Sequence, residues 1–219
     1  MDATHGYLEL IIGTMFSGKS TELIRRVNRY EVAGRRVQLF KPSLDDRYGL
    51  DHISSHDGLK RGVHFIREPD EILDLLDDQT RVVGIDEIHF FASDVIDVCE
   101  GLANLGRTVI ASGLLKDFRD EYFPFRSGGK TMADLARTAD YVIYLKAICT
   151  YQEGDEICGR EATRVQRFIN GRVAPYDSPT IAVGGKEAYA PRCRQHFVAY
   201  GERAKKSRTL PLFPERSDL

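Results

Sequence analysis

The sequence has no tryptophan, only three methionines and four cysteines among its 219 residues, and a net charge of only −2. It also has no apolar run long enough to cross a membrane. Residues 1–5 lack the basic and then apolar layout of a secretory signal. We therefore expect a cytoplasmic protein with no membrane partner. Because stable disulfides are uncommon in the cytoplasm, the cysteines are expected to be core residues, reactive thiols or metal ligands.

The near-neutral charge balance argues against a nucleic-acid partner, since proteins that bind duplex DNA present an excess of lysine and arginine to the phosphates. Hydrophobic residues make up 42% of the chain and charged residues 29%, which is typical of a folded globular protein. A chain of this length suits one domain, or one domain with a small appendage.

One segment near the N-terminus has the form G-x-x-x-x-G-K-[ST] of a phosphate-binding P-loop. Its residues are Gly13, Thr14, Met15, Phe16, Ser17, Gly18, Lys19 and Ser20. An apolar stretch at 7–12 precedes the loop like a buried strand, and a helical pattern at 22–27 follows it. Backbone N–H groups in such a loop and at the helix start face one anion. We expect Lys19 to reach the β- and γ-phosphates of a nucleoside triphosphate and the Ser20 hydroxyl to bind Mg²⁺.

Strand and helix patterns then alternate along the chain. Further strands are expected at 37–40, 62–66, 81–85, 108–112 and 141–145, and helices at 69–76, about 94–105 and 133–139. Gly34 is expected to end the helix after the P-loop, and Ser93 and Asp94 to cap the helix that they precede. Such alternation predicts an α/β fold with a parallel sheet flanked by helices.

The character of the sequence changes after Lys146, where cysteines, glycines and prolines become frequent and helical periodicity fades. We therefore expect three parts: a P-loop nucleotide-binding domain at 1–146, a small zinc-binding lobe at 147–200, and a charged, disordered tail at 201–219.

Two acidic residues, Asp86 and Glu87, follow the expected strand at 81–85. Because the carboxyl ends of parallel strands meet where ligands bind, Asp86 is placed to hold Mg²⁺ and Glu87 to accept a proton from the attacking group. A plain acidic strand end is the simpler interpretation, and the upstream P-loop favours the functional one. If Glu87 activates water, the protein is an ATPase, and if it activates a hydroxyl, it is a kinase. With His89, the segment also matches the D-E-x-H motif of helicases.

Metal-ligand residue types gather in the C-terminal part. Cys193 and His196 form a C-x-x-H pair that suits tetrahedral zinc, and Cys149 and Cys158 supply a second pair. The first pair is stretched by an apparent inserted loop. Zinc would stabilise a lobe with little core of its own. The alternative is isolated buried thiols and a surface histidine. Cys99 lies between apolar positions of an expected helix and is interpreted as a core residue.

Ordered motifs from residue 10 to residue 196 resemble the type II thymidine kinases, the family of the cytosolic human enzyme and most bacterial ones. Beyond the P-loop, the motifs are F-K-P at 40–42, D-D-R-Y at 45–48, S-H-D-G at 55–58, D-E-x-H-F-F at 86–91, D-F-R at 117–119, P-F at 124–125, V-G-G at 183–185, Tyr189 and Cys193. Each is weak alone, and the ordered set is specific. The resemblance implies a P-loop (RecA-like) α/β domain with a small C-terminal zinc-binding lobe that carries a lid-like loop.

The resemblance implies phosphorylation of the 5′-hydroxyl of thymidine by ATP and Mg²⁺ to give dTMP, with Glu87 as the general base. The implied ATP and Mg²⁺ site adds Asp45, Arg47, Asp86 and His89 to the P-loop residues. The implied nucleoside site comprises Met15, Phe90, Leu114, Phe118, Phe125, Thr180, Ile181, Ala182, Val183, Gly184 and Tyr189. Structural Zn²⁺ is implied at the four C-terminal ligands. Members of the family are typically homotetramers inhibited by the end product dTTP.

The chain departs from the family pattern at His89, where glutamine is usual, at Leu115, which replaces an acidic residue, and at Val165, where a threonine is frequent. Extra residues also lie between Arg119 and Pro124. None of these departures falls in the P-loop or the acidic pair. They bear on base selectivity, and deoxyuridine is therefore expected as a comparable substrate.

Thymidine kinase activity is the leading hypothesis, and two others stay open. A nucleic-acid-stimulated P-loop ATPase would hydrolyse ATP faster with single-stranded DNA or RNA and would ignore nucleosides. A non-catalytic nucleotide sensor with a zinc-ribbon lobe would bind ATP without turnover.

Overall fold

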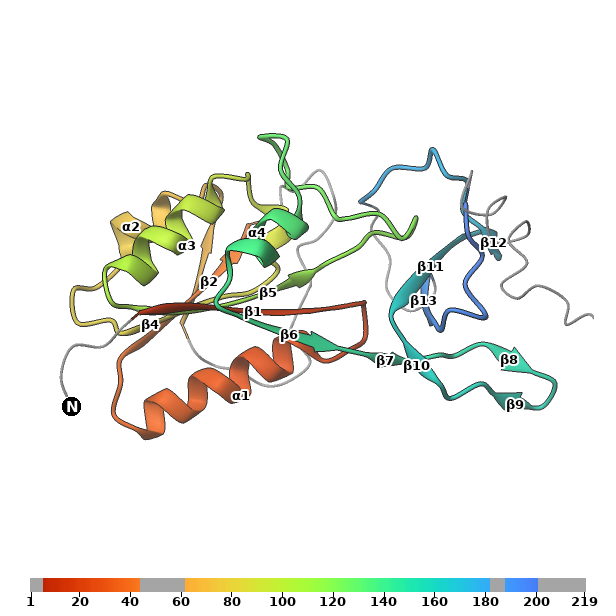
Figure 1. Cartoon of the computed structure of the whole chain (residues 1–219), viewed down its shortest axis with the longest axis horizontal. Helices are drawn as coiled ribbons and strands as arrows, with labels where there is room; N and C mark the ends of the chain where they lie inside the picture. Colours follow the sequence, from red (N-terminus) through yellow and green to blue (C-terminus); the bar gives the residue numbers. More distant parts are fainter. Residues whose placement is uncertain (1–5, 44–61, 182–187, 201–219) are drawn as a thin grey trace, which may run out of the picture.

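The computed structural model describes residues 6–43, 62–181 and 188–200 (Figure 1). Its centre is a six-stranded sheet in the order β3-β2-β4-β5-β1-β6, with every neighbouring pair parallel. The strands are β1 (Tyr7–Gly13), β2 (Val37–Pro42), β3 (Val63–Ile66), β4 (Val82–Ile85), β5 (Thr108–Leu114) and β6 (Tyr141–Leu145). The helices are α1 (Lys19–Val32), α2 (Glu71–Leu75), α3 (Val95–Asn104) and α4 (Met132–Thr138), with a short 3₁₀ helix, η2 (Ile88–Phe90). The predicted α/β fold is confirmed.

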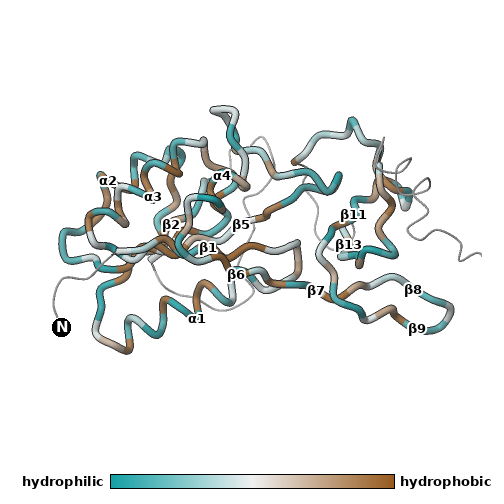
Figure 2. Tube along the Cα trace, viewed as in Figure 1, coloured by the Kyte–Doolittle hydropathy of each residue, from teal (hydrophilic) through white to brown (hydrophobic). Residues whose placement is uncertain are grey.

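The sheet lies between two helical layers because its central strands are apolar on both faces. In β1, Leu8 and Leu10 belong to the larger apolar core, which residues of α3 and α4 complete. Ile11 points to the other face, where it packs with Leu23 and Val27 of α1. Figure 1 shows α1 on one side of the sheet and α2, α3 and α4 on the other. In Figure 2 the hydrophobic colour is concentrated on the central strands β1 and β5. Such two-sided burial produces the near-continuous apolar runs by which these strands were predicted.

The helix ends follow most of the predicted signals. Gly34 adopts φ 72° just after α1, as expected of a C-terminal stop. Thr131 and Asp134 form a capping box at the start of α4. The prediction of a side-chain cap on α3 is wrong for Asp94, which makes no capping hydrogen bond in the described structure. Its backbone is already helical, at φ −65° and ψ −15°, whereas a capping residue needs an extended backbone. No helix in the described ranges combines the length and apolarity needed to cross a membrane.

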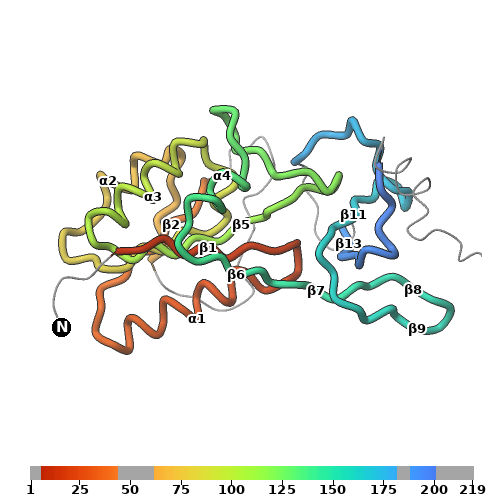
Figure 3. The backbone as a smooth tube through the Cα atoms, in the orientation of Figure 1, coloured from red at the N-terminus to blue at the C-terminus, as the bar shows by residue number. Residues whose placement is uncertain are grey.

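Beyond β6 the described chain forms short strands. They are β7 (Ala147–Ile148), β8 (Gln152–Glu153), β9 (Glu156–Ile157), β10 (Glu161–Ala162), β11 (Arg164–Ile169), β12 (Arg172–Val173) and β13 (Tyr189–Arg192). They pair antiparallel as β10-β7, β12-β11-β13 and β8-β9. Figure 3 shows the chain passing from β6 directly into β7, with this lobe beyond the carboxyl ends of the sheet strands. The division at 1–146, 147–200 and 201–219 stays a prediction, and the predicted tail lies outside the described residues.

Candidate active site

The P-loop joins β1 to α1 through an unusual backbone. Phe16, at φ 66°, and Gly18, at φ 83°, both adopt the left-handed conformation. A non-glycine residue in this region is strained, and such strain is common at functional sites. Gly13 is required by space, because a Cβ there would lie 2.5 Å from the carbonyl oxygen of Leu145. The loop therefore turns tightly enough to face its N–H groups and the start of α1 toward one anion.

The Lys19 side chain lies within this loop. Its Nζ donates to the carbonyl oxygen of Thr14 at 3.0 Å, and the Ser17 hydroxyl donates to the same oxygen at 2.8 Å. Burial lowers the pKa of Lys19, while the carboxylates of Glu87 and Asp86 act in the opposite direction. The ammonium is thus held where little water reaches, and there it interacts strongly with a phosphate.

Asp86, directly after β4, collects polar partners from three neighbouring elements. The Ser20 hydroxyl donates to both of its carboxylate oxygens at 3.0 Å. Ser112 of β5 also donates to Asp86, and Lys41 Nζ of β2 lies 3.4 Å from it. A hydroxyl and a carboxylate side by side are the hard oxygen ligands that Mg²⁺ prefers. The donor set therefore fits the predicted magnesium site.

Glu87 sits in a second strained turn, at φ 53°. Its side chain is 25% exposed and lines a cavity at the carboxyl end of the sheet. Burial and the neighbouring Asp86 charge raise the pKa of Glu87, against the opposing effect of Lys19 and Lys41. A raised pKa brings a carboxylate closer to the working pH, which is the property that a general base requires.

The cavity has a volume of about 310 Å³, within the range of small-molecule sites. Lys19 and Ser20 of the P-loop form part of its wall together with Glu87. Much of the remaining wall is apolar or aromatic. The cavity lining includes seven of the residues that were predicted to bind the nucleoside, namely Met15, Phe90, Leu114, Phe118, Thr180, Ile181 and Tyr189. The structure thus joins the phosphate loop, the acidic residue and the predicted nucleoside residues in one space.

Some predicted residues lie elsewhere. Phe125 is 5% exposed and packs in the sheet core. Its backbone N–H donates to the carbonyl oxygen of Lys130 in the turn before α4. Phe123 lines the cavity in its place. His89 is buried beside Glu87 and is absent from the described cavity lining. Outside the described residues lie Asp45, Arg47, Ala182, Val183 and Gly184.

Arg119 ties a distant segment to the loop after β5. Its guanidinium donates to the carbonyl oxygen of Tyr176 at 2.6 Å, to that of Ser178, and to the Thr180 hydroxyl at 3.1 Å. It is itself paired with Asp117. These bonds fix residues 176–180 against the loop and bring Thr180 into the cavity wall.

Several contributors to the site were missed from the sequence, and four of them illustrate why. Ser112 and Lys41 contact Asp86, and Phe123 and Lys116 line the cavity. The first two lie at or near the carboxyl ends of β5 and β2, so polar residues at strand ends were a usable signal. No sequence signal distinguished Phe123 from Phe125.

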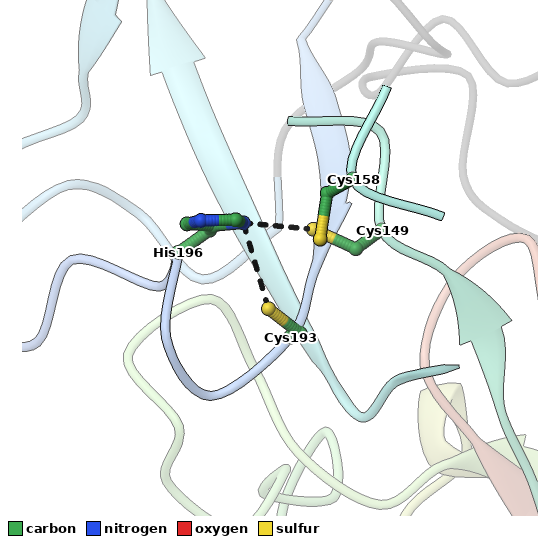
Figure 4. Close-up of side chains that lie close together, drawn as sticks. All are labelled: Cys149, Cys158, Cys193 and His196. Carbon is green, nitrogen blue, oxygen red and sulfur yellow. Dashed lines mark hydrogen bonds between the residues drawn. The ribbon is translucent and has the colours of Figure 1, made fainter. Parts of the chain in front are cut away.

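The predicted metal ligands converge in the C-terminal lobe, as Figure 4 shows. Cys149 and Cys158 flank the β8-β9 hairpin, whereas Cys193 and His196 follow β13. One ligand atom from each residue lies within 4.8 Å of the others. The alternative of isolated thiols and a surface histidine is therefore wrong. Cys99 is fully buried in the sheet core, which confirms its interpretation.

The spacing of these atoms suits zinc. A tetrahedral Zn²⁺ with usual bond lengths holds its sulfur and nitrogen ligands ~3.6 Å apart. His196 Nδ1 lies 3.7 Å from Cys149 Sγ and 3.6 Å from Cys193 Sγ. Thiolates and imidazole are also ligands that zinc accepts, whereas magnesium and calcium prefer oxygen.

A carboxylate that lines one largely apolar cavity together with a phosphate loop suits a kinase, because such a cavity can hold an acceptor molecule next to the phosphates. By fold and site the protein is a P-loop enzyme of the kinase class. The family model described as thymidine kinase matches residues 6–197. The chain belongs to the thymidine kinase family.

Curated relatives agree with this assignment. The thymidine kinase of Pyrobaculum aerophilum is 49% identical over 195 residues, which cover 87% of this chain and 98% of that protein. Those of Thermococcus kodakarensis and Mycoplasma capricolum are both 42% identical, covering 90% and 89% of this chain and 96% and 90% of their own lengths.

Solved structures with a similar fold are more distant. The flagellar accessory protein FlaH from Methanocaldococcus jannaschii has 16% identity and a TM-score of 0.40, covering 70% of this chain and 76% of that chain. The Legionella pneumophila ATPase DotB has 18% identity and a TM-score of 0.41, covering 73% and 44%. Such low scores support no inference about this chain.

Proposed function

We propose that this enzyme transfers the γ-phosphoryl group of ATP to the 5′-hydroxyl of thymidine and releases dTMP and ADP. The observation that carries the proposal is the position of Glu87, whose carboxylate lines one cavity together with Lys19 of the P-loop and Phe118. A base at this boundary can act on an acceptor hydroxyl next to the transferring phosphate. The relatives named thymidine kinase, at 42% to 49% identity, support thymidine as that acceptor.

The P-loop side of the cavity would bind the phosphates of ATP. Backbone N–H groups of residues 13–20 and the Lys19 ammonium supply positive charge there. Ser20 and Asp86 are the residues that would hold Mg²⁺, and Asp45 and Arg47 are proposed to complete the nucleotide side. Bound Mg²⁺ supplies charge neutralisation for the transferring phosphoryl group.

The other side of the cavity would bind the nucleoside. Phe90, Phe118 and Tyr189 contribute aromatic side chains to the cavity wall, and these would pack against a pyrimidine ring. Glu87 would accept the proton of the 5′-hydroxyl as that oxygen attacks phosphorus. Residues 180–184 are proposed as a lid over the nucleoside, which would keep water from competing for ATP.

The geometry favours a kinase over the alternatives. A nucleic-acid-stimulated ATPase needs only water as acceptor, so it has no use for an apolar cavity beside Glu87. A non-catalytic sensor has no use for a half-buried carboxylate in a strained turn next to the phosphate loop. Deoxyuridine, which lacks only the methyl group of thymidine, is proposed as a second and weaker substrate, because loss of one such group lowers kcat/KM by about 10- to 200-fold.

A nucleoside panel tests the proposal. Purified enzyme is supplied with ATP, Mg²⁺ and one nucleoside at a time, and nucleoside monophosphate is measured by chromatography. We expect turnover with thymidine, less with deoxyuridine, and very little ADP without a nucleoside. ATP hydrolysis that is raised by single-stranded DNA and indifferent to thymidine would support the ATPase instead.

The assembly and regulation implied by the family are proposed together with this function. We propose a homotetramer that is inhibited by dTTP, holds a structural zinc ion and is located in the cytoplasm. Light scattering on the purified enzyme tests the tetramer, and dTTP added to the thymidine assay tests the inhibition.

A further inference from the structure

His89 is an ionisable side chain that the proposed mechanism does not use, although it lies beside the proposed base. It belongs to η2, and its ring is fully buried. The rings of Phe90 and Phe123 pack against it, with centroids 4.1 Å and 4.5 Å away. Close packing of this kind leaves a ring little freedom to reorient.

The backbone determines which nitrogen of His89 carries the proton. The Leu114 N–H donates to His89 Nδ1 at 3.2 Å, so Nδ1 acts as an acceptor. Burial, helped by the nearby Lys19 cation, lowers the pKa of His89 well below its usual range, and the ring is therefore neutral. A neutral imidazole whose Nδ1 accepts carries its hydrogen on Nε2.

This Nε2–H faces the proposed base. It has no hydrogen-bond partner among the described residues, and Glu87 Oε2 lies 3.5 Å from it. A buried donor left without a partner costs about 1–3 kcal/mol. Hydrogen bonds between catalytic groups are often long before substrate binds and shorten in the complex.

We infer that His89 is a positioning residue for Glu87. In the complex with substrate its Nε2–H closes on Glu87 Oε2, so the other carboxylate oxygen stays directed at the acceptor hydroxyl. The inference rests on the proposed function, in which Glu87 is the base. It also gives a role to the residue at which this chain departs from the glutamine usual in the family.

Two substitutions separate this role from simple packing. His89→Gln keeps an acceptor for the Leu114 N–H and a donor for Glu87, whereas His89→Leu keeps bulk but offers neither. We expect His89→Leu to lower kcat about 10- to 100-fold with little change in the KM for thymidine, since misplacement of a reacting group acts on turnover. His89→Gln is expected to stay close to the wild type. Equal kcat losses in both variants, or none in His89→Leu, would overturn the inference.

A spectroscopic measurement tests the same geometry in the wild-type enzyme itself. In the wild-type enzyme labelled with ¹⁵N-histidine, the His89 signals are identified by their loss in His89→Gln. We expect the neutral Nε2–H form, and an Nδ1–H or doubly protonated ring would contradict the inference. An active wild type with an inactive Glu87→Gln and a fully active His89→Leu refutes only this inference. A wild type that phosphorylates no nucleoside refutes the proposed function and the inference with it.

A second inference comes from the insertion between Cys149 and Cys158, which forms the β8-β9 hairpin. Glu153 in this hairpin places Oε1 2.7 Å from His196 Nε2. The Tyr151 ring stacks on the His196 ring, with centroids 4.1 Å apart and an interplanar angle of 22°. Both contacts orient the imidazole so that Nδ1 faces the cysteine sulfurs (Figure 4).

The geometry points to Glu153 as a positioning residue for zinc. By accepting from Nε2–H, its carboxylate keeps the proton off Nδ1, which is then available to the metal. Carboxylates behind a metal-bound histidine commonly act in this way. The insertion that stretches the first cysteine pair therefore carries a functional group and is not a neutral loop.

The matched pair Glu153→Ala and Glu156→Ala tests this role, because Glu156 lies opposite Glu153 in the same hairpin. Zinc affinity of the full chain is measured by competition with a chromophoric chelator. We expect Glu153→Ala to bind zinc about 10- to 100-fold more weakly, as for other such partners, and Glu156→Ala to match the wild type. Equal affinities in both variants would overturn the inference. A wild type with no zinc affinity would overturn it together with the zinc site.

Discussion

Replacing Glu87 with glutamine removes the proposed base but keeps the shape of the side chain. General bases contribute about 10²- to 10⁴-fold to turnover, which corresponds to about 2.7–5.4 kcal/mol in the activation barrier. Burial and the Asp86 charge raise the pKa of Glu87, so the ionised carboxylate is disfavoured where it stands. We therefore expect Glu87→Gln to lose kcat by this factor while its melting temperature stays the same or rises.

The pH dependence of the wild type adds a second readout. Protonated Glu87 cannot accept a proton, so activity falls as the pH drops through its pKa. Because that pKa is raised in the folded enzyme, the acid limb of kcat/KM should lie above the ordinary glutamate value of about 4.3. Glu87→Gln should lack this limb.

The assay is ADP release with saturating ATP and thymidine, with ATP affinity measured separately. Affinity for ATP should persist, since Lys19 and Ser20 are unchanged. Glu100→Gln, at an exposed position of α3, is the matched control. A Glu87→Gln variant whose kcat stays within about threefold of the wild type would refute the assignment of the base.

Two further predictions concern Phe118 and Cys99. Phe118→Ala should raise the KM for thymidine far more than the KM for ATP, because a base–aromatic stack is worth about 1–3 kcal/mol. The control is Phe65→Ala, at an exposed position of β3. A Phe118→Ala variant with an unchanged KM for thymidine would show that Phe118 does not contact the nucleoside. Burial raises the pKa of Cys99 from 9.0 to about 12, so its thiol should resist iodoacetamide at pH 8 until the protein is denatured. The unfolded chain loses the Cys99 thiol proton at a lower pH than the folded protein does. The free energy of unfolding should therefore fall as the pH rises from 9.0 to about 12. Cys99→Ala should lessen that fall, as measured by denaturant titrations.

The parts of the site that could be predicted are those whose sequence signal lies within one short segment of the chain. The P-loop spans 13–20 between a strand and a helix, so its backbone requirements appear as fixed glycines and a lysine. Asp86 and Glu87 follow an apolar run directly, which marks them as the end of a buried strand. The cluster of three cysteines and one histidine could be predicted because these residues are rare in this chain and two of them form a C-x-x-H pair.

The parts that could not be predicted depend on which strands become neighbours. Ser112 reaches Asp86 only because β5 lies beside β4, and Lys41 only because β2 lies on the other side. Strand order results from crossover connections that no local pattern encodes. Phe123 rather than Phe125 faces the cavity because of where the chain turns toward α4, and the partnership of Glu153 with His196 depends on a hairpin folding back over the metal site.

The most direct test of the central claim follows the γ-phosphoryl group itself. ATP labelled at the γ-phosphorus is incubated with the enzyme, Mg²⁺ and thymidine, and the label is divided between dTMP and inorganic phosphate. We predict that nearly all transferred label appears at the 5′-position of dTMP, and that omission of thymidine leaves the ATP largely intact. Label that accumulates as inorganic phosphate at the same rate with and without thymidine would contradict the account.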